Sequence, residues 1–161
     1  MTTAFLVAGL LLAAGYAFLT NESPRRSPGY LITLEDRAPS KAAVVLINMG
    51  TNEYTLKMAA EELPENVAFS FSPYAMYKRS FGREVIETIK ADVVIDTDFY
   101  NEDVKKQLDL AEHTALKQGK VIVAAVAKPN IIIALRLWAD GFNAQNNLEL
   151  VPISMLIEEE L

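Results

Sequence analysis

The stretch between Ala42 and Pro73 constrains the fold more than any other part of the chain. A β-branched run at 44–47 is followed by apolar residues at helical spacing as far as Pro64, and then by a second apolar run at 67–71. This order predicts a βαβ unit, whose two strands lie parallel in a sheet that helices cover. Ligands of such sheets bind beyond the carboxyl ends of the strands, so side chains that follow the predicted strands are the first candidates for a functional site.

The remainder of the chain continues the alternation of strands and helices. The predicted elements are helices at 75–89, from Asp98 or Asn101 to Gly119 and from Pro129 to about Ala139, and strands at 92–95, 121–125 and 148–151. The segment 84–89 could also be extended, but only two residues separate it from the next strand, and a parallel crossover needs about a dozen. We therefore expect a helix there, in an α/β domain with about five mainly parallel strands and flanking helices.

Composition excludes several classes of function. The 161 residues are 51% apolar, enough for one domain with a real core, and carry a net charge of -6. An acidic chain without a basic stripe does not fit nucleic-acid binding. The lack of cysteine excludes disulfides, cysteine-ligated zinc and thiol catalysis, and it fits either side of a membrane.

The first twenty residues carry no charged side chain. As a helix, residues 4–19 span about 24 Å at roughly 1.5 Å per residue, and their neighbours extend this to the ~30 Å hydrocarbon core. A cleaved signal peptide is the alternative, but the usual Lys or Arg before its apolar run is missing. We expect residues 1–20 to be a single membrane anchor. Gly9 and Ala13 have the spacing that lets another helix approach, although a general enrichment of small residues explains it equally well.

Residues 21–41 separate this segment from the predicted domain at 42–161, and their content of Pro, Ser, Arg and Gly is typical of an irregular linker. Four basic residues follow the apolar run up to position 41, and none precedes it. Because basic residues favour the cytoplasmic side, this distribution favours a cytoplasmic domain.

Three pieces of the chain, at 63–75 (LPENVAFSFSPYA), 107–119 and 150–154 (LVPIS), resemble in order the divergent polysaccharide deacetylase family. This family is a periplasmic branch of the metal-dependent carbohydrate esterases with a distorted (β/α) barrel. The likeness covers roughly 41–156, and its most specific element is the strand that ends in Ser-Pro-Tyr-Ala. The resemblance implies a shortened deacetylase-like barrel at the bacterial inner membrane, with the domain in the periplasm rather than on the cytoplasmic face.

The departures from the family fall on its catalytic positions. The resemblance implies an Asp-Asp pair, serving as base and metal ligand, where residues 47–48 are Ile-Asn. It implies Gly-His-Glu where residues 82–84 are Gly-Arg-Glu, a further His at Thr88, and Gly-His-Pro where residues 125–127 are Ala-Val-Ala. At 90–91 the chain passes directly to a later strand, so the family's long central portion is missing.

The residue types present in the chain also argue against catalysis, without any appeal to the resemblance. Metal-assisted hydrolysis needs three or more nitrogen or oxygen ligands and a base, and the chain has one histidine. His113 is expected on the surface of an acidic helix, one turn from Asp109. No nucleophile elbow and no phosphate-binding glycine motif occurs in the chain. We therefore expect a pseudoenzyme with no catalytic residues, no metal ligands and no cofactor.

Polar side chains beyond the predicted strands form a candidate ligand rim, consisting of Asn48, Thr51, Tyr74, Asp96 and Asp98. Oxygen ligands in this place suit weak Mg²⁺ or glycan binding. Capping of the following helix by Asp98 is the alternative explanation for the acidic residues there.

The helix after Pro129 is apolar nearly all the way round, which indicates burial on more than one side. Burial within the domain explains this pattern, and so does coverage by another chain where the missing portion leaves apolar surface. The expected partner contacts are Gly9, Ala13, Ile131, Leu135 and Trp138. The sequence thus predicts a non-catalytic accessory subunit of a membrane protein complex, anchored in membrane lipid. The alternative is a periplasmic carbohydrate-binding or carbohydrate-modifying envelope protein that uses the rim.

Overall fold

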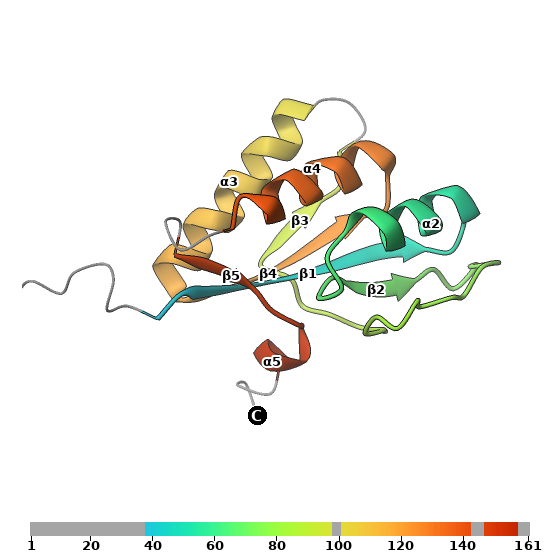
Figure 1. Ribbon diagram of the computed structural model, residues 1–161, viewed down its shortest axis with the longest axis horizontal. Helices are drawn as coiled ribbons and strands as arrows, with labels where there is room; N and C mark the ends of the chain where they lie inside the picture. Colours follow the sequence, from blue (N-terminus) through green and yellow to red (C-terminus); the bar gives the residue numbers. More distant parts are fainter. Residues whose placement is uncertain (1–37, 98–100, 143–146, 158–161) are drawn as a thin grey trace, which may run out of the picture. The chain divides into compact units, whose positions relative to one another are not determined.

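The computed structural model describes residues 38–97, 101–142 and 147–157 (Figure 1). Its elements are β1 (Ser40–Met49), α2 (Glu53–Glu62), β2 (Ala68–Phe71), β3 (Val93–Ile95), α3 (Asn101–Gln118), β4 (Lys120–Val126), α4 (Pro129–Asp140), β5 (Leu148–Leu150) and α5 (Ser154–Ile157). The predicted anchor at 1–20 and the linker as far as 37 lie outside the described residues. Within the described ranges, no helix is both long and apolar enough to cross a membrane.

β1 lies at the centre of a five-stranded parallel sheet. β4 pairs with one edge of β1, and β3 pairs with the far edge of β4. The other edge of β1 is divided between two strands, because β5 pairs with residues 40–42 and β2 with residues 45–49. The side-chain amide of Asn66 donates to the carbonyl of Leu150 at 2.9 Å and links the two strands that share this edge. The predicted α/β class with five parallel strands is confirmed, although the described strands form an open sheet rather than a closed barrel.

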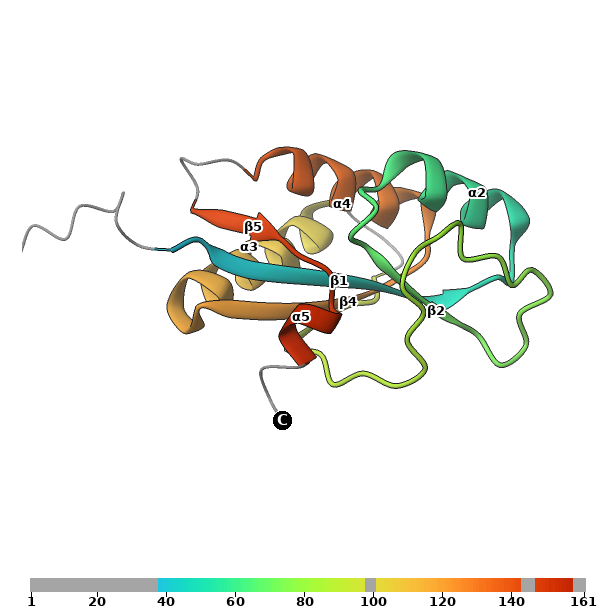
Figure 2. The same cartoon turned by 60° about the horizontal axis from the view of Figure 1, so that its bottom comes forward.

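Two layers cover the sheet (Figure 2). Helices α2, α3 and α4 lie on one face, while α5 and the long loop between β2 and β3 lie on the other. Successive side chains of a strand point to opposite faces, so Val44 and Leu46 of β1 join the core under the helices. Ala43 and Val45 join a second cluster with Leu156 of α5.

The sequence spacing of the helices explains how they pack. α3 buries Val104, Leu108, Ala111 and Ala115, as predicted, and ends at Gly119, which has φ +83°. α4 buries Ile131, Ile132 and Leu135 but leaves Ile133 and Leu137 exposed. This helix is therefore buried on one side within the described domain, and not on several sides as its composition indicated.

The helix predicted at 75–89 is wrong, because the structure has turns and extended chain there. Phe81 and Gly82 adopt left-handed conformations, with φ of 54° and 80°, which interrupt any helix. Val85 then forms a parallel bridge with Phe69 of β2. The sequence argument against an extended segment at 84–89 is the short link between it and the next strand. That objection fails because β3 pairs with β4, on the other side of β1 from β2, and is not a neighbour of Val85.

Arg83 holds this loop against the end of α2. Its guanidinium donates to the carbonyls of Ala60 at 3.0 Å and Leu63 at 2.7 Å, and also to that of Pro64. It lies 5.2 Å from the centre of the Phe69 ring, and only 8% of the residue is exposed. The last carbonyls of a helix lack partners within the helix, and a cation is favourable near them. Arg83 therefore supplies the cap that the last turn of α2, which has no basic residue, does not contain.

The loop at 72–77 folds back over the carboxyl end of β1. The N–H groups of Met76 and Tyr77 both donate to the carbonyl of Gly50 at 3.0 Å. A Cβ at Gly50 would lie 2.4 Å from the Tyr77 carbonyl oxygen, and the φ of Gly50 is +85°. Close backbone approach and a left-handed conformation together require glycine at this position.

Replacement of Arg83 should destabilise the domain more than replacement of an exposed arginine in the same loop. Arg83→Met leaves buried carbonyls without a donor, so the free energy of unfolding should fall by about 2–4 kcal/mol. Arg83→Lys keeps the charge but not the planar fork, and most of the loss should remain. Urea unfolding followed by circular dichroism measures the change. Arg79→Met is the control and should cost less than about 0.5 kcal/mol. Equal losses at both positions would contradict the capping role.

Two glycines with nearly the same φ separate backbone strain from steric clash. Gly119→Ala should cost about 1 kcal/mol, because φ is +83° but no atom lies within 4 Å of the new Cβ. Gly50→Ala should cost roughly 1–3 kcal/mol more, because the Tyr77 carbonyl must move. Thermal unfolding of the two variants provides the comparison, and similar losses would show that the loop is not held tightly over β1.

Candidate functional site

The predicted rim residues lie at the carboxyl ends of the strands. Asn48 is the penultimate residue of β1 and Thr51 follows that strand, Tyr74 follows β2 and Asp96 follows β3, and all four are exposed. Asp98 lies outside the described residues. Parallel strands bring these residues to the same end of the sheet, as expected.

The rim residues do not share a pocket. The cavity at the end of β1 has a volume of about 10 Å³, which is close to the minimum for one water molecule. It is lined by Asn48, Met49, Gly50, Thr51, Asn52, Thr55, Leu56 and Ala127. Tyr74 and Asp96 are not part of this lining, and Tyr74 is 88% exposed. The structure therefore brings Asn48 and Thr51 together but leaves the other two rim residues apart from them.

Several of the polar groups here serve the backbone or each other. The side chain of Asn52 accepts the N–H groups of Tyr54 and Thr55, at 2.8 and 3.3 Å, and caps α2. The carboxylate of Asp96 forms an ion pair with the ammonium of Lys128, just before α4, at 3.0 Å. These contacts support the two helices that begin at this end of the sheet.

The positions at which the resemblance implies metal ligands do not all come together, although Ile47 of β1 and Val126 of β4 pair in register. Arg83 binds carbonyls at the carboxyl end of α2, next to the start of β2, whereas Asn48 lies at the carboxyl end of β1. The carboxylate of Glu84 accepts a hydrogen bond from the hydroxyl of Ser154 and thereby caps α5. Val126, at the position of the histidine in the family's Gly-His-Pro, is the last residue of β4. One carboxamide, one cation and a valine do not fit a divalent metal ion, and no group of three His, Asp or Glu side chains comes together in the described part of the chain.

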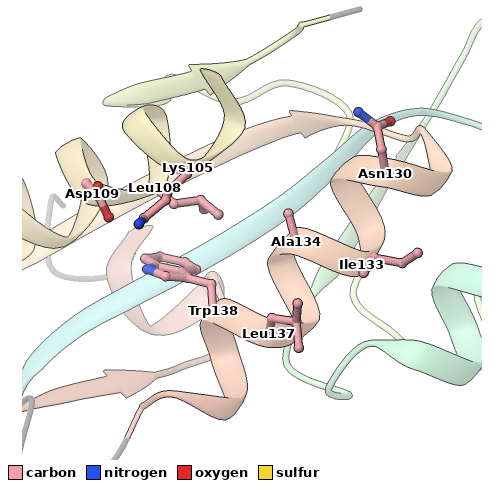
Figure 3. A pocket seen from close by; sticks show the side chains of 8 residues that line it. All are labelled: Lys105, Leu108, Asp109, Asn130, Ile133, Ala134, Leu137 and Trp138. Carbon is pink, nitrogen blue, oxygen red and sulfur yellow. The ribbon is translucent and has the colours of Figure 1, made fainter. Parts of the chain in front are cut away.

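A larger hollow lies elsewhere, between α3 and α4 (Figure 3). This α3–α4 groove has a volume of about 390 Å³ and is lined by Lys105, Leu108, Asp109, Asn130, Ile133, Ala134, Leu137 and Trp138. Ile133 is 42% exposed and Leu137 is 60% exposed. The Trp138 ring lies in the groove wall and contacts Phe142 edge-on, with 4.6 Å between the ring centres.

The α3–α4 groove changes the predicted contact surface. Ile131 and Leu135 were expected to contact a partner, but they are 0% and 2% exposed and belong to the core. Trp138 does lie in the groove, whereas Gly9 and Ala13 lie outside the described residues. Sequence reasoning missed Ile133 and Leu137 as the exposed pair. Their four-residue spacing is the signal that places both residues on the same side of α4. The sequence of α4 does not say which side faces outward, because that depends on packing against α2 and α3, which are distant in sequence.

Comparison with known proteins agrees with the fold. Residues 80–157 match the family model described as divergent polysaccharide deacetylase. The crystal structure of the uncharacterized protein ATU2773 from Agrobacterium tumefaciens C58 is similar, with a TM-score of 0.65 and 13% identity, over 75% of this chain and 90% of that one. At this identity the likeness concerns the fold alone. No curated protein sequence matches the chain significantly.

The matched range contains two of the three sequence pieces that carried the resemblance, at 107–119 and 150–154, while the piece at 63–75 precedes it. The resemblance is therefore confirmed to this extent: residues 80–157 match the divergent polysaccharide deacetylase family.

Proposed function

We propose that this domain is non-catalytic and acts as a binding or structural accessory subunit of a membrane protein complex. The observation that carries this proposal is the closed carboxyl end of β1. The loop at 72–77 is hydrogen-bonded to Gly50, and the cavity beside it holds about 10 Å³. Substrate pockets are usually larger than roughly 300 Å³, so this cavity is too small to enclose an acetylated sugar.

The charged residues of the loop support the same proposal. Hydrolysis of an acetyl group needs a base and an electrophile that face one reacting atom. Arg83 and Glu84 are instead bound to a helix end and to α5, respectively. Asp96 is exposed and paired with Lys128. None of these three side chains lines the α3–α4 groove or the cavity at the end of β1.

A binding role is supported by the apolar surface in the α3–α4 groove. Exposed Ile133 and Leu137 lie beside Trp138, and contiguous apolar surface of this kind marks contact sites on many proteins. We propose that residues 1–20 anchor the protein in the lipid of the bacterial inner membrane, with the domain in the periplasm. The uncharged length of this segment supports the anchor.

The full-length protein, purified in mild detergent and incubated with Zn²⁺, Co²⁺ or Mn²⁺, should release no acetate from acetylated chitooligosaccharides above the buffer background. Bound metal, measured by mass spectrometry of the washed protein, should stay far below one ion per chain. Asp96→Ala should behave like the wild type in both assays. Chelator-sensitive release of acetate that disappears in Asp96→Ala would instead favour a carbohydrate-modifying function.

The anchor can be tested on isolated membranes. The wild type should remain with the membrane after a carbonate wash. The double variant Leu11→Arg/Leu12→Arg should appear in the soluble fraction, because each arginine at the centre of the span costs about 3 kcal/mol. Ser23→Arg/Ser27→Arg adds the same charge outside the span and should stay bound. A wild type that washes off would rule out the anchor, and protease treatment of spheroplasts then shows which side the domain faces.

A further inference from the structure

The α3–α4 groove combines apolar surface with two charges of opposite sign. Lys105 and Asp109 lie one helical turn apart on α3, and both are exposed. Within the described residues, neither forms an ion pair with a neighbour, whereas Lys106 pairs with Asp103 on the same helix. On the facing wall, Ile133 and Leu137 also lie one turn apart on α4. An occupant that covers this groove must match a cation, an anion and an apolar ridge at the same time.

We propose that the occupant is a second copy of the same chain, related to the first by a two-fold axis. This inference rests on the proposed function, since it names a partner for the binding surface. When two identical helices pack antiparallel about a two-fold axis, positions equally far from the axis on either side face each other. An axis that passes α3 near Gln107 therefore sets Lys105 opposite the partner's Asp109, and Asp109 opposite the partner's Lys105. The same operation, centred near Leu135 on α4, sets Ile133 against the partner's Leu137.

Other occupants match the groove less well. An anionic ligand would pair with Lys105 but meet the carboxylate of Asp109, and a cationic ligand would meet the reverse conflict. A lipid chain would cover the apolar ridge but remove both charges from water without pairing them, which is costly. A second copy satisfies all three requirements with residues that this chain already has. The net charge of -6 opposes the approach of two copies, so the local charge pairs set the orientation while the apolar contacts provide the affinity.

Trp138 makes the occupancy of the groove measurable. It is the single tryptophan of the chain, so its fluorescence reports this place alone. Figure 3 shows the indole ring lying across the groove, with its nitrogen toward the side of α3. The indole nitrogen is buried and has no hydrogen-bond partner in the described part of the chain. Contact with a second copy removes water from around this ring, and its emission should move to shorter wavelength.

The experiment uses the full-length chain in mild detergent over a range of protein concentrations. Light scattering coupled to size-exclusion chromatography should give a detergent-corrected mass of two chains, and tryptophan emission should shift over the same concentrations. Leu137→Asp should remain monomeric, with emission that does not depend on concentration. Leu110→Asp is the matched control, because Leu110 is 50% exposed on α3 but does not line the groove, and this variant should still dimerise.

Charge reversal tests the two-fold arrangement itself and uses exposed positions that do not contribute to the core. Lys105→Asp and Asp109→Lys should each weaken the dimer by on the order of tenfold, because each change places like charges opposite one another. The double variant Lys105→Asp/Asp109→Lys should restore most of the affinity. Circular dichroism establishes that each variant is folded, and the charge series decides the matter if Leu137→Asp does not fold.

The results that would overturn the dimer differ from those that would overturn the proposed function. A monomer at every concentration overturns the dimer, as does a dimer that Leu137→Asp leaves intact or a double reversal no better than the single ones. None of these results restores catalysis. Conversely, metal-dependent release of acetate would overturn the non-catalytic function while leaving a measured dimer in place.

Discussion

The pairing of β1 along both edges is the constraint on which the rest of the domain depends. β4 follows one edge of β1 from Lys41 to Ile47, and β5 and β2 divide the other. Leu46 and Val45 consequently belong to different apolar layers, on opposite faces of the sheet. A slip of one residue in the register of β1 would exchange these faces and expose both layers. The position of every loop beyond the strand follows from this register.

Charged side chains in this domain are used to hold segments of backbone together. Burial lowers the pKa of the Arg83 guanidinium, and the nearby carboxylate of Glu65 partly opposes that effect. The lowered pKa reflects the cost of removing this cation from water, which the carbonyls at the end of α2 offset. Glu84, the next residue, holds α5 through Ser154. Two adjacent charged residues thus join the loop to a helix on each face of the sheet.

Much of the fold could be predicted from local patterns. The β-branched run at 44–47, the spacing of the buried residues of α3 and the glycine at 119 each act over a few residues, and the structure agrees with them. The segment 75–89 could not be predicted in this way, because its conformation depends on the contacts of Arg83 with α2 and of Val85 with β2. The positions of the rim residues followed from strand order alone. Whether they share a cavity depends on the loop over Gly50, which no local pattern reveals. The α3–α4 groove was missed for a related reason, since β4 separates its two walls in sequence and only tertiary packing brings them together.

The division of one β1 edge between β5 and β2 has a consequence for biosynthesis. Ser40 lies at the start of the described chain, and its pairing partner Leu148 lies near the end. Until β5 emerges from the ribosome, residues 41–42 of β1 can pair with β4 on one edge but lack their second neighbour on the other. Long-range pairing of this kind is slow to form and leaves a strand edge open to other chains in the meantime. The nascent domain therefore stays incomplete until β5 emerges. A chaperone that shields this edge of β1 would act during that interval.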